Sequence, residues 1–135
     1  MLRRTFSVAE ANAALPEVRR LTERIVERSR RLPELHEELR IRTYRARREG
    51  ASAGEREAAT FAAADLRRVE LDLADALRDL GRAGVQLKDA MDGVVDFPSV
   101  RGGRVVELCW QVGEPEVAHW HAVGGGFRSR QPLRP

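Results

Sequence analysis

Apolar residues recur at steps of three and four residues through the first half of the chain, which is the spacing of an amphipathic helix. Two arginines, Arg28 and Arg42, interrupt the first apolar stripe, whose other members are Val18, Leu21, Ile25, Leu32, Leu35 and Leu39. Ser7 and Glu10 form an S-x-x-E capping box that predicts where this helix begins. Pro16 and Pro33 each predict either a bend or the start of a new helical segment.

A second apolar stripe predicts an uninterrupted helix over residues 55–80. Its spacing alternates between four and three residues, through Ala62, Leu66, Val69, Leu73, Ala76 and Leu80. Gly81 and Gly84 predict its end, and the glycine-containing segment 48–57 predicts the loop before it. Two long helices joined by a short loop are expected to form an antiparallel hairpin. One hairpin buries only the seam between its two helices. We expect the sheet or a second subunit to cover the remaining apolar surface of the helices, and therefore expect a homodimer.

After Gly84 the apolar period changes to two, which indicates short strands. The predicted strands are "VQLK", "VVDFPSVR", "RVVELCWQV" and "EVAHWHAV". A two-residue turn at Gly102 and Gly103 and a three-residue loop from Gly113 to Pro115 are expected to join the last three. The predicted fold class is α+β: a long antiparallel helical hairpin followed by a small antiparallel β-meander of three to four strands. We expect a single domain, 1–135, with the hairpin over 1–83, the sheet over 84–123 and a loop-like C-terminal tail over 124–135.

These two turns fix the register of the predicted strands. They place Asp96 opposite Cys109, Cys109 opposite His119, and Glu107 opposite His121. One face then carries the apolar set Leu87, Val95, Phe97, Val106, Leu108, Trp110, Ala118 and Trp120, which should pack on the helices. The other face carries the polar set Gln86, Lys88, Asp96, Glu107, Cys109, Gln111, His119 and His121.

The polar face collects side chains that could bind zinc or iron. The candidate ligands are Asp96, Glu107, Cys109, His119 and His121. No C-x-x-C or H-E-x-x-H spacing supports a metal site, so a cross-strand ion pair between Glu107 and His121 is the alternative. Cys109 with His119 as its base has the residue types of a nucleophilic pair but lies in no recognised nucleophile motif.

The composition of the chain bears on its cellular location and on whether it binds membranes or nucleic acid. The chain has 135 residues, a net charge of +3 and one cysteine, which excludes an internal disulfide and suits a reducing cytoplasm. No apolar run reaches the length of a membrane span and the start of the chain has no apolar signal core, so we expect a cytoplasmic protein with no membrane partner. The helical arginines alternate with glutamates and aromatics make up only 5%, which argues against nucleic-acid binding. Phosphate or nucleic-acid binding through Lys88, beside Asp89, with Arg128 and Arg130, is the alternative that a basic chain leaves open.

Five motifs resemble the prokaryotic domain-of-unknown-function family 2203, in order and over almost the whole chain. They read "FSVAEANAALPEVRRL", "GVQLKD", "GVVDFP", "LCWQVGEPEVAHWH" and "GFRSRQP". The positions that fit are Lys88, Asp89, Gly93, Asp96, Phe97, Cys109, Trp110, Gly113, Glu114, Trp120, His121, Gly126, Phe127, Arg130 and Pro132. The resemblance implies a bacterial or archaeal cytoplasmic protein and no established activity. Ser129 replaces a glycine of the family pattern, no acidic residue follows the W-H pair, and His119 lies outside the motif.

Three functional hypotheses follow, and none of them decides whether the protein is an enzyme. The first is a non-enzymatic homo-oligomeric binding or assembly module, in which the helices contact a second copy or a protein partner. The second is a zinc- or iron-binding protein, or a metal-dependent enzyme, using the polar face. The third is the phosphate or nucleic-acid binder.

Overall fold

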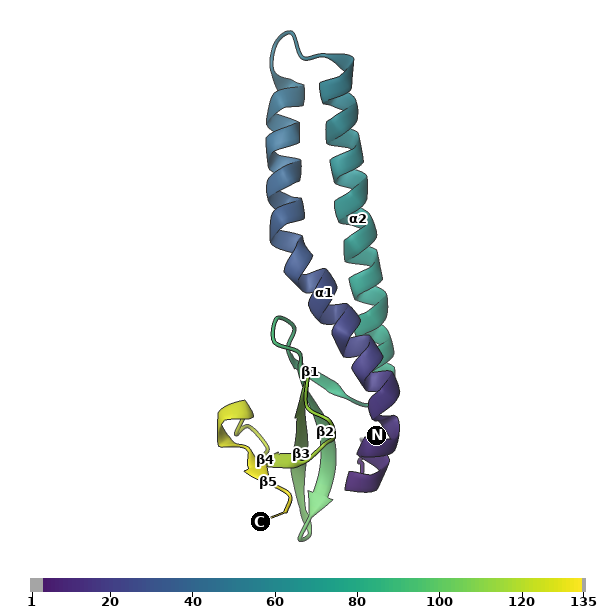
Figure 1. Ribbon diagram of the computed structural model, residues 1–135, viewed down its shortest axis with the longest axis vertical. Helices are drawn as coiled ribbons and strands as arrows, with labels where there is room; N and C mark the ends of the chain where they lie inside the picture. Colours follow the sequence, from purple (N-terminus) through teal and green to yellow (C-terminus); the bar gives the residue numbers. More distant parts are fainter. Residues whose placement is uncertain (1–3, 135) are drawn as a thin grey trace.

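The computed structural model describes residues 4–134, which form a long helical hairpin with a small sheet at one end (Figure 1). The helices are α1 (Val8–Arg47) and α2 (Ala53–Arg82). The five strands lie in the order β1-β2-β3-β4-β5, and their bounds are Gln86–Asp89, Val94–Arg101, Arg104–Gln111, His119–Ala122 and Gln131–Pro132. Every strand pair is antiparallel, so the α+β prediction is confirmed.

Each helix begins at a capping box. Ser7 accepts a hydrogen bond from the Glu10 N–H at 3.0 Å, as the sequence predicted. Ser52 and Glu55 form the same motif at the start of α2, and this second box was missed. The α1 helix runs without a break through both of its prolines, so neither begins a new helix.

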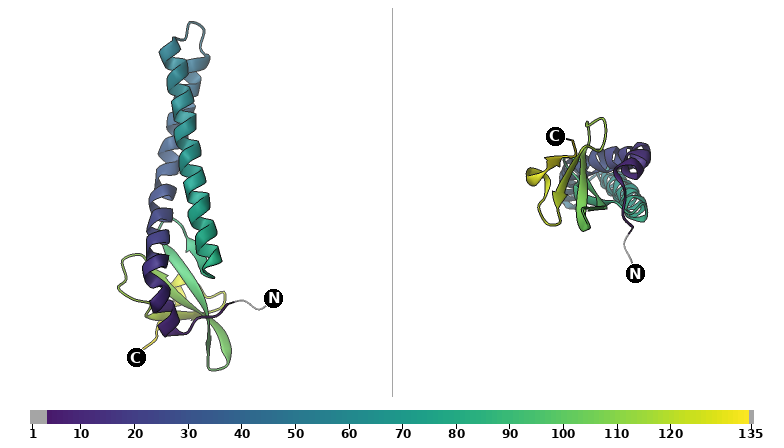
Figure 2. Two further views of the ribbon diagram at one scale, coloured as in Figure 1. Left: turned by 90° about the vertical axis from the view of Figure 1, so that its right-hand side faces the viewer. Right: turned by 90° about the horizontal axis from the view of Figure 1, so that it is seen from below.

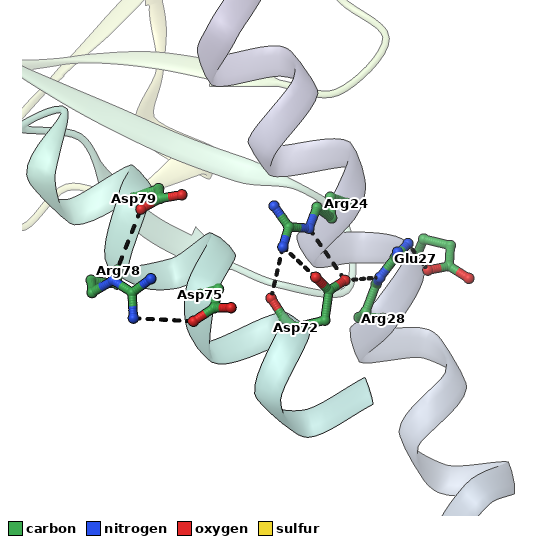
Figure 3. A network of polar contacts seen from close by, with 7 residues as sticks. All are labelled: Arg24, Glu27, Arg28, Asp72, Asp75, Arg78 and Asp79. Atoms are coloured by element: carbon green, nitrogen blue, oxygen red, sulfur yellow. Dashed lines mark hydrogen bonds and ion pairs between the residues drawn. The ribbon is translucent and has the colours of Figure 1, made fainter. Parts of the chain in front are cut away.

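Arg28 interrupts the apolar stripe of α1 because Asp72 of α2 faces it across the hairpin. Asp72 of α2 accepts hydrogen bonds from both Arg24 and Arg28, and its Oδ2 lies 2.5 Å from Arg28 Nε (Figure 3). The two guanidinium groups hold the pKa of Asp72 at about 2, below its ordinary 3.8. This ion-pair cluster fixes how α1 and α2 face each other where the hairpin leaves the sheet.

The sheet packs against one side of the lower end of the hairpin, and the C-terminal segment lies beyond it, away from the helices (Figure 2). Phe97, Leu108 and Trp110 project from the apolar face into the same core as Leu21 and Ile25 of α1. The aromatic ring of Phe6, just before α1, packs edge-on against that of Phe97, with 5.2 Å between the ring centroids. No helix among residues 4–134 combines the length and the apolar character that a membrane span requires.

The predicted register is confirmed at the pairs that matter for the polar face. Asp96 lies opposite Cys109, Cys109 opposite His119, and Glu107 opposite His121. The predicted three-residue loop after β3 is wrong, since residues 112–118 separate β3 from β4. Consequently Ala118, expected on the apolar face of the last strand, lies outside the paired strands.

The C-terminal tail is also more ordered than predicted. Phe127–Ser129 form a short 3₁₀ helix, η1, and Gln131–Pro132 pair with β4 as a fifth strand. The backbone N–H of Leu133 donates to the Ala118 carbonyl at 2.9 Å, which extends this attachment. No pattern in the sequence indicates this strand, because it is two residues long and contains a proline.

Candidate metal centre in the sheet

Three adjacent strands bring one carboxylate, one thiol and one imidazole together on the polar face. Asp96 of β2, Cys109 of β3 and His121 of β4 each offer a ligand atom, and these atoms all lie within 4.8 Å of one another. Asp96 and Cys109 are fully buried, and only 2% of the His121 surface is exposed. The polar face is therefore closed from solvent at this point, although its composition resembles that of a surface.

The hydrogen bonds of His121 define the direction of its ring. Nδ1 lies 2.8 Å from the backbone carbonyl oxygen of Ala122, and since a carbonyl only accepts, Nδ1 carries the hydrogen. Nε2 lies 3.0 Å from Asp96 Oδ2. In a neutral imidazole with this tautomer, Nε2 has a lone pair and faces a carboxylate oxygen that is also an acceptor. A positive charge at this point, either a proton on Nε2 or a metal ion, would make the contact favourable.

The other two groups of the cluster are the Asp96 carboxylate and the Cys109 thiol, which interact with each other. Asp96 Oδ1 is buried and accepts no hydrogen bond from residues 4–134. Burial and the neighbouring Asp96 charge raise the pKa of the Cys109 thiol to about 12. Cys109 is therefore a neutral thiol at physiological pH even with the Arg130 guanidinium nearby, which does not favour the nucleophilic role.

The five predicted ligands do not all converge. His119 lies opposite Cys109, but its ring is part-exposed and its Nδ1 is 3.7 Å from Glu114 Oε2. Glu107 is buried opposite His121 but is not one of the three residues whose ligand atoms converge. Diagonal neighbours on adjacent strands are within reach of long side chains, which is how His121 rather than His119 joins Cys109.

An ion pair from the loop and the tail borders the cluster. Arg130 Nη1 lies 2.9 Å from Glu114 Oε1, which also accepts from the Gln111 N–H at 2.7 Å. Burial disfavours ionised Glu114, but these two contacts outweigh it and its pKa is lowered. The Arg130 guanidinium also interacts with the Cys109 thiol. The sequence singled out Glu114 and Arg130 separately, but no local pattern showed that they join.

The remaining predicted residues lie outside the group. Lys88 is exposed on β1, and Arg128 is exposed in η1. Asp89 caps the turn after β1, since its Oδ1 accepts from the N–H groups of Met91 and Asp92, each at 2.9 Å. These contacts give Asp89 a structural part in the turn.

Comparison with known families agrees with the resemblance seen in the motifs. The model of the family described as uncharacterized conserved protein (DUF2203) matches residues 4–133. The chain belongs to this DUF2203 family. The comparison with curated proteins found no match, and neither did the comparison with solved structures. Every residue of the Asp96–Cys109–His121 cluster falls within the DUF2203 match, and the family description names no activity.

Proposed function

We propose that the protein binds a transition metal ion, zinc or iron(II), through Asp96, Cys109 and His121. The observation that carries the proposal is the direction of the His121 ring. Its Nδ1–H is bonded to a backbone carbonyl, which is the usual outer-shell arrangement of a metal-binding histidine, and its Nε2 points at Asp96.

A metal ion accounts for more of the cluster than a proton does. A proton on Nε2 would satisfy His121 and Asp96 Oδ2 only. A cation would also attract Asp96 Oδ1, which no described donor reaches, and would convert Cys109 to a thiolate ligand. The mixed sulfur, nitrogen and oxygen set suits zinc or iron and does not suit calcium or magnesium, which prefer oxygen ligands.

The burial of the cluster favours a structural role for the metal. Three protein ligands leave one position of a tetrahedral site, and buried Glu107, opposite His121, is the candidate to fill it. A site of four protein ligands has no position for a substrate and contributes directly to folding stability. In this proposal the metal joins β2, β3 and β4, the three central strands of a small sheet.

The test is metal content by mass spectrometry on untagged protein purified without chelators. We expect close to one zinc or iron per chain, lost in His121→Ala. His119→Ala is the matched control, because it removes a histidine two residues away on the same strand, outside the converging group. Metal retained by His121→Ala, or wild-type protein free of metal after growth with both metals, would contradict the proposal.

We propose as a second function that the hairpin supports self-association, in a cytoplasmic protein. Figure 1 shows the upper part of α1 and α2 standing clear of the sheet, so no third layer covers it. Phe61 and Leu71 of α2 are exposed. Light scattering at micromolar concentration should give twice the mass of one chain, and a monomer would exclude this homodimer.

A further inference from the structure

We propose that the far end of the hairpin binds single-stranded nucleic acid, through arginines arranged around Tyr44. The surface consists of residues 40–48 of α1 and its C-cap, called the basic tip below. It lies at the opposite end of the molecule from the sheet and does not depend on the metal proposal (Figure 1).

The basic tip departs from the alternation of arginine and glutamate along the rest of α1, although Glu49 follows it directly. Residues 40–48 contain five arginines and no acidic residue, whereas the whole chain carries a net charge of only +3. Arg40 pairs with Glu37, Arg42 with Glu38 and Arg48 with Glu55. Within residues 4–134, Arg45 and Arg47 form no salt bridge. The three pairs are exposed, and such pairs are weak enough to be exchanged for phosphate contacts.

Tyr44 lies at the centre of this surface. It is 70% exposed, and it borders two surface hollows. One hollow is lined by Arg40, Thr43, Tyr44, Arg47 and Arg48, and the other by Arg40, Ile41, Tyr44, Arg45 and Arg48. Arg40, Tyr44 and Arg47 follow the i, i+4, i+7 spacing, so they share one side of the helix.

This combination matches a nucleic-acid strand better than an acidic peptide. A strand presents phosphates and flat bases in alternation, and here an exposed aromatic ring lies between cations. Arginine can also bind phosphate in a bidentate manner, and it stacks on bases. An acidic peptide would use the arginines but would leave the Tyr44 ring without a matching partner.

The first test compares fluorescence anisotropy of labelled single-stranded RNA and DNA of about 20 nucleotides, a length chosen to exceed one binding site. The variant Arg45→Glu/Arg47→Glu should bind at least tenfold more weakly and show a shallower salt dependence, because two phosphate contacts are lost. Arg67→Glu/Arg82→Glu is the matched control on α2. Four charge units are removed in each variant, which takes the net charge from +3 to −1. The control should retain more affinity than the tip variant.

The second test isolates the aromatic ring. Tyr44→Ala should weaken binding about tenfold without changing the salt dependence, because stacking involves no counterion release. Phe127→Ala is the control, since this exposed ring of η1 lies at the sheet end of the chain, outside the two hollows. All six substituted positions are exposed, and circular dichroism should show unchanged helicity.

Three results would overturn the proposal. The first is the absence of oligonucleotide binding by the wild-type protein at low salt. The second is an equal loss in the tip and control charge variants, which would indicate attraction to the net charge alone. The third is equal competition by polyglutamate with no effect of Tyr44→Ala, which would assign the basic tip to an acidic protein partner. A difference between RNA and DNA affinities would identify which nucleic acid is preferred.

Discussion

His121 Nε2 lies 3.0 Å from Asp96 Oδ2 inside the sheet, while the opposite ring nitrogen of His121 is bonded to the Ala122 carbonyl. Both side chains are buried, so water cannot separate them. A neutral imidazole in this position would set one acceptor against another, and burial makes such a contact costly. A proton shared by the two atoms or a metal ion between them removes this clash, and the two have different experimental signatures.

The substitution Asp96→Asn distinguishes the proton from the metal. An asparagine amide can donate to Nε2 of a neutral His121, so the metal-free variant should unfold within a few degrees of the metal-free wild type. The neutral amide is a poor metal ligand, so the rise in unfolding temperature on adding zinc should be lost. Thermal unfolding of both proteins with and without zinc measures this. A zinc response equal to that of the wild type would argue against Asp96 as a ligand.

Arg130 should control access to Cys109. It pairs with Glu114 and interacts with the thiol, so Arg130→Ala removes one of the contacts that attach the C-terminal segment to this side of the sheet. In metal-free protein we expect the thiol to react with an alkylating reagent at least tenfold faster in this variant. Arg128→Ala, an exposed arginine of η1, is the control and should react like the wild type. Equal rates in all three proteins would show that Arg130 does not protect Cys109.

Asp72 should make the hairpin sensitive to acid. Its pKa is about 2 in the folded protein against an ordinary 3.8, so it stabilises the fold above about pH 4 and loses this effect as the pH falls toward 2. Because the group is nearly one-third exposed, we expect Asp72→Asn to cost only about 1 kcal/mol at pH 7. Urea unfolding at several pH values measures both effects. The difference between variant and wild type should shrink below pH 4, and a constant difference would contradict the ion-pair explanation.

Gly93 should tolerate no side chain. Its φ is +70°, and an added Cβ would lie 2.5 Å from Val112 Cγ2 and 3.0 Å from Val26 Cγ2. Backbone strain and overpacking together should make Gly93→Ala cost about 2–5 kcal/mol of unfolding free energy. Gly113→Ala is the control: φ there is +102° but nothing lies within 4 Å, so only the strain of about 1–2 kcal/mol remains. Equal losses of unfolding free energy in the two variants would show that Val112 moves away from the added Cβ at no cost in stability.

The candidate metal centre shows which of its residue positions could be predicted from the sequence. Alternating polarity and the Gly102–Gly103 turn placed Asp96 opposite Cys109, and the structure confirms that pair. The same reasoning treated His119 and His121 alike, because both lie on the polar face. The family motif, which includes His121 and not His119, separated them, and side-chain direction agrees: His121 turns inward to Asp96, and His119 turns to Glu114 at the rim.

What the sequence determined by itself is what depends on local periodicity. Apolar spacing of 3.6 residues specified the two helices, a spacing of two specified the main strands, and turn geometry specified which residues share a face. These properties follow from the backbone, because helical and extended chains repeat over a few residues. The same patterns did not predict whether the polar face is exposed to solvent or buried. They also did not predict which acidic residue pairs with Arg28.

The tertiary structure decided the features that depend on distant segments. Asp72 explains the arginine in the seam, although 44 positions separate it from Arg28. The C-terminal segment adds a fifth strand and brings Arg130 to Cys109 and Glu114, although it lacks an apolar period of its own. Burial is a property of the whole chain, since it depends on which surfaces meet. A buried cluster of acid, thiol and imidazole therefore becomes visible only when the strands are assembled.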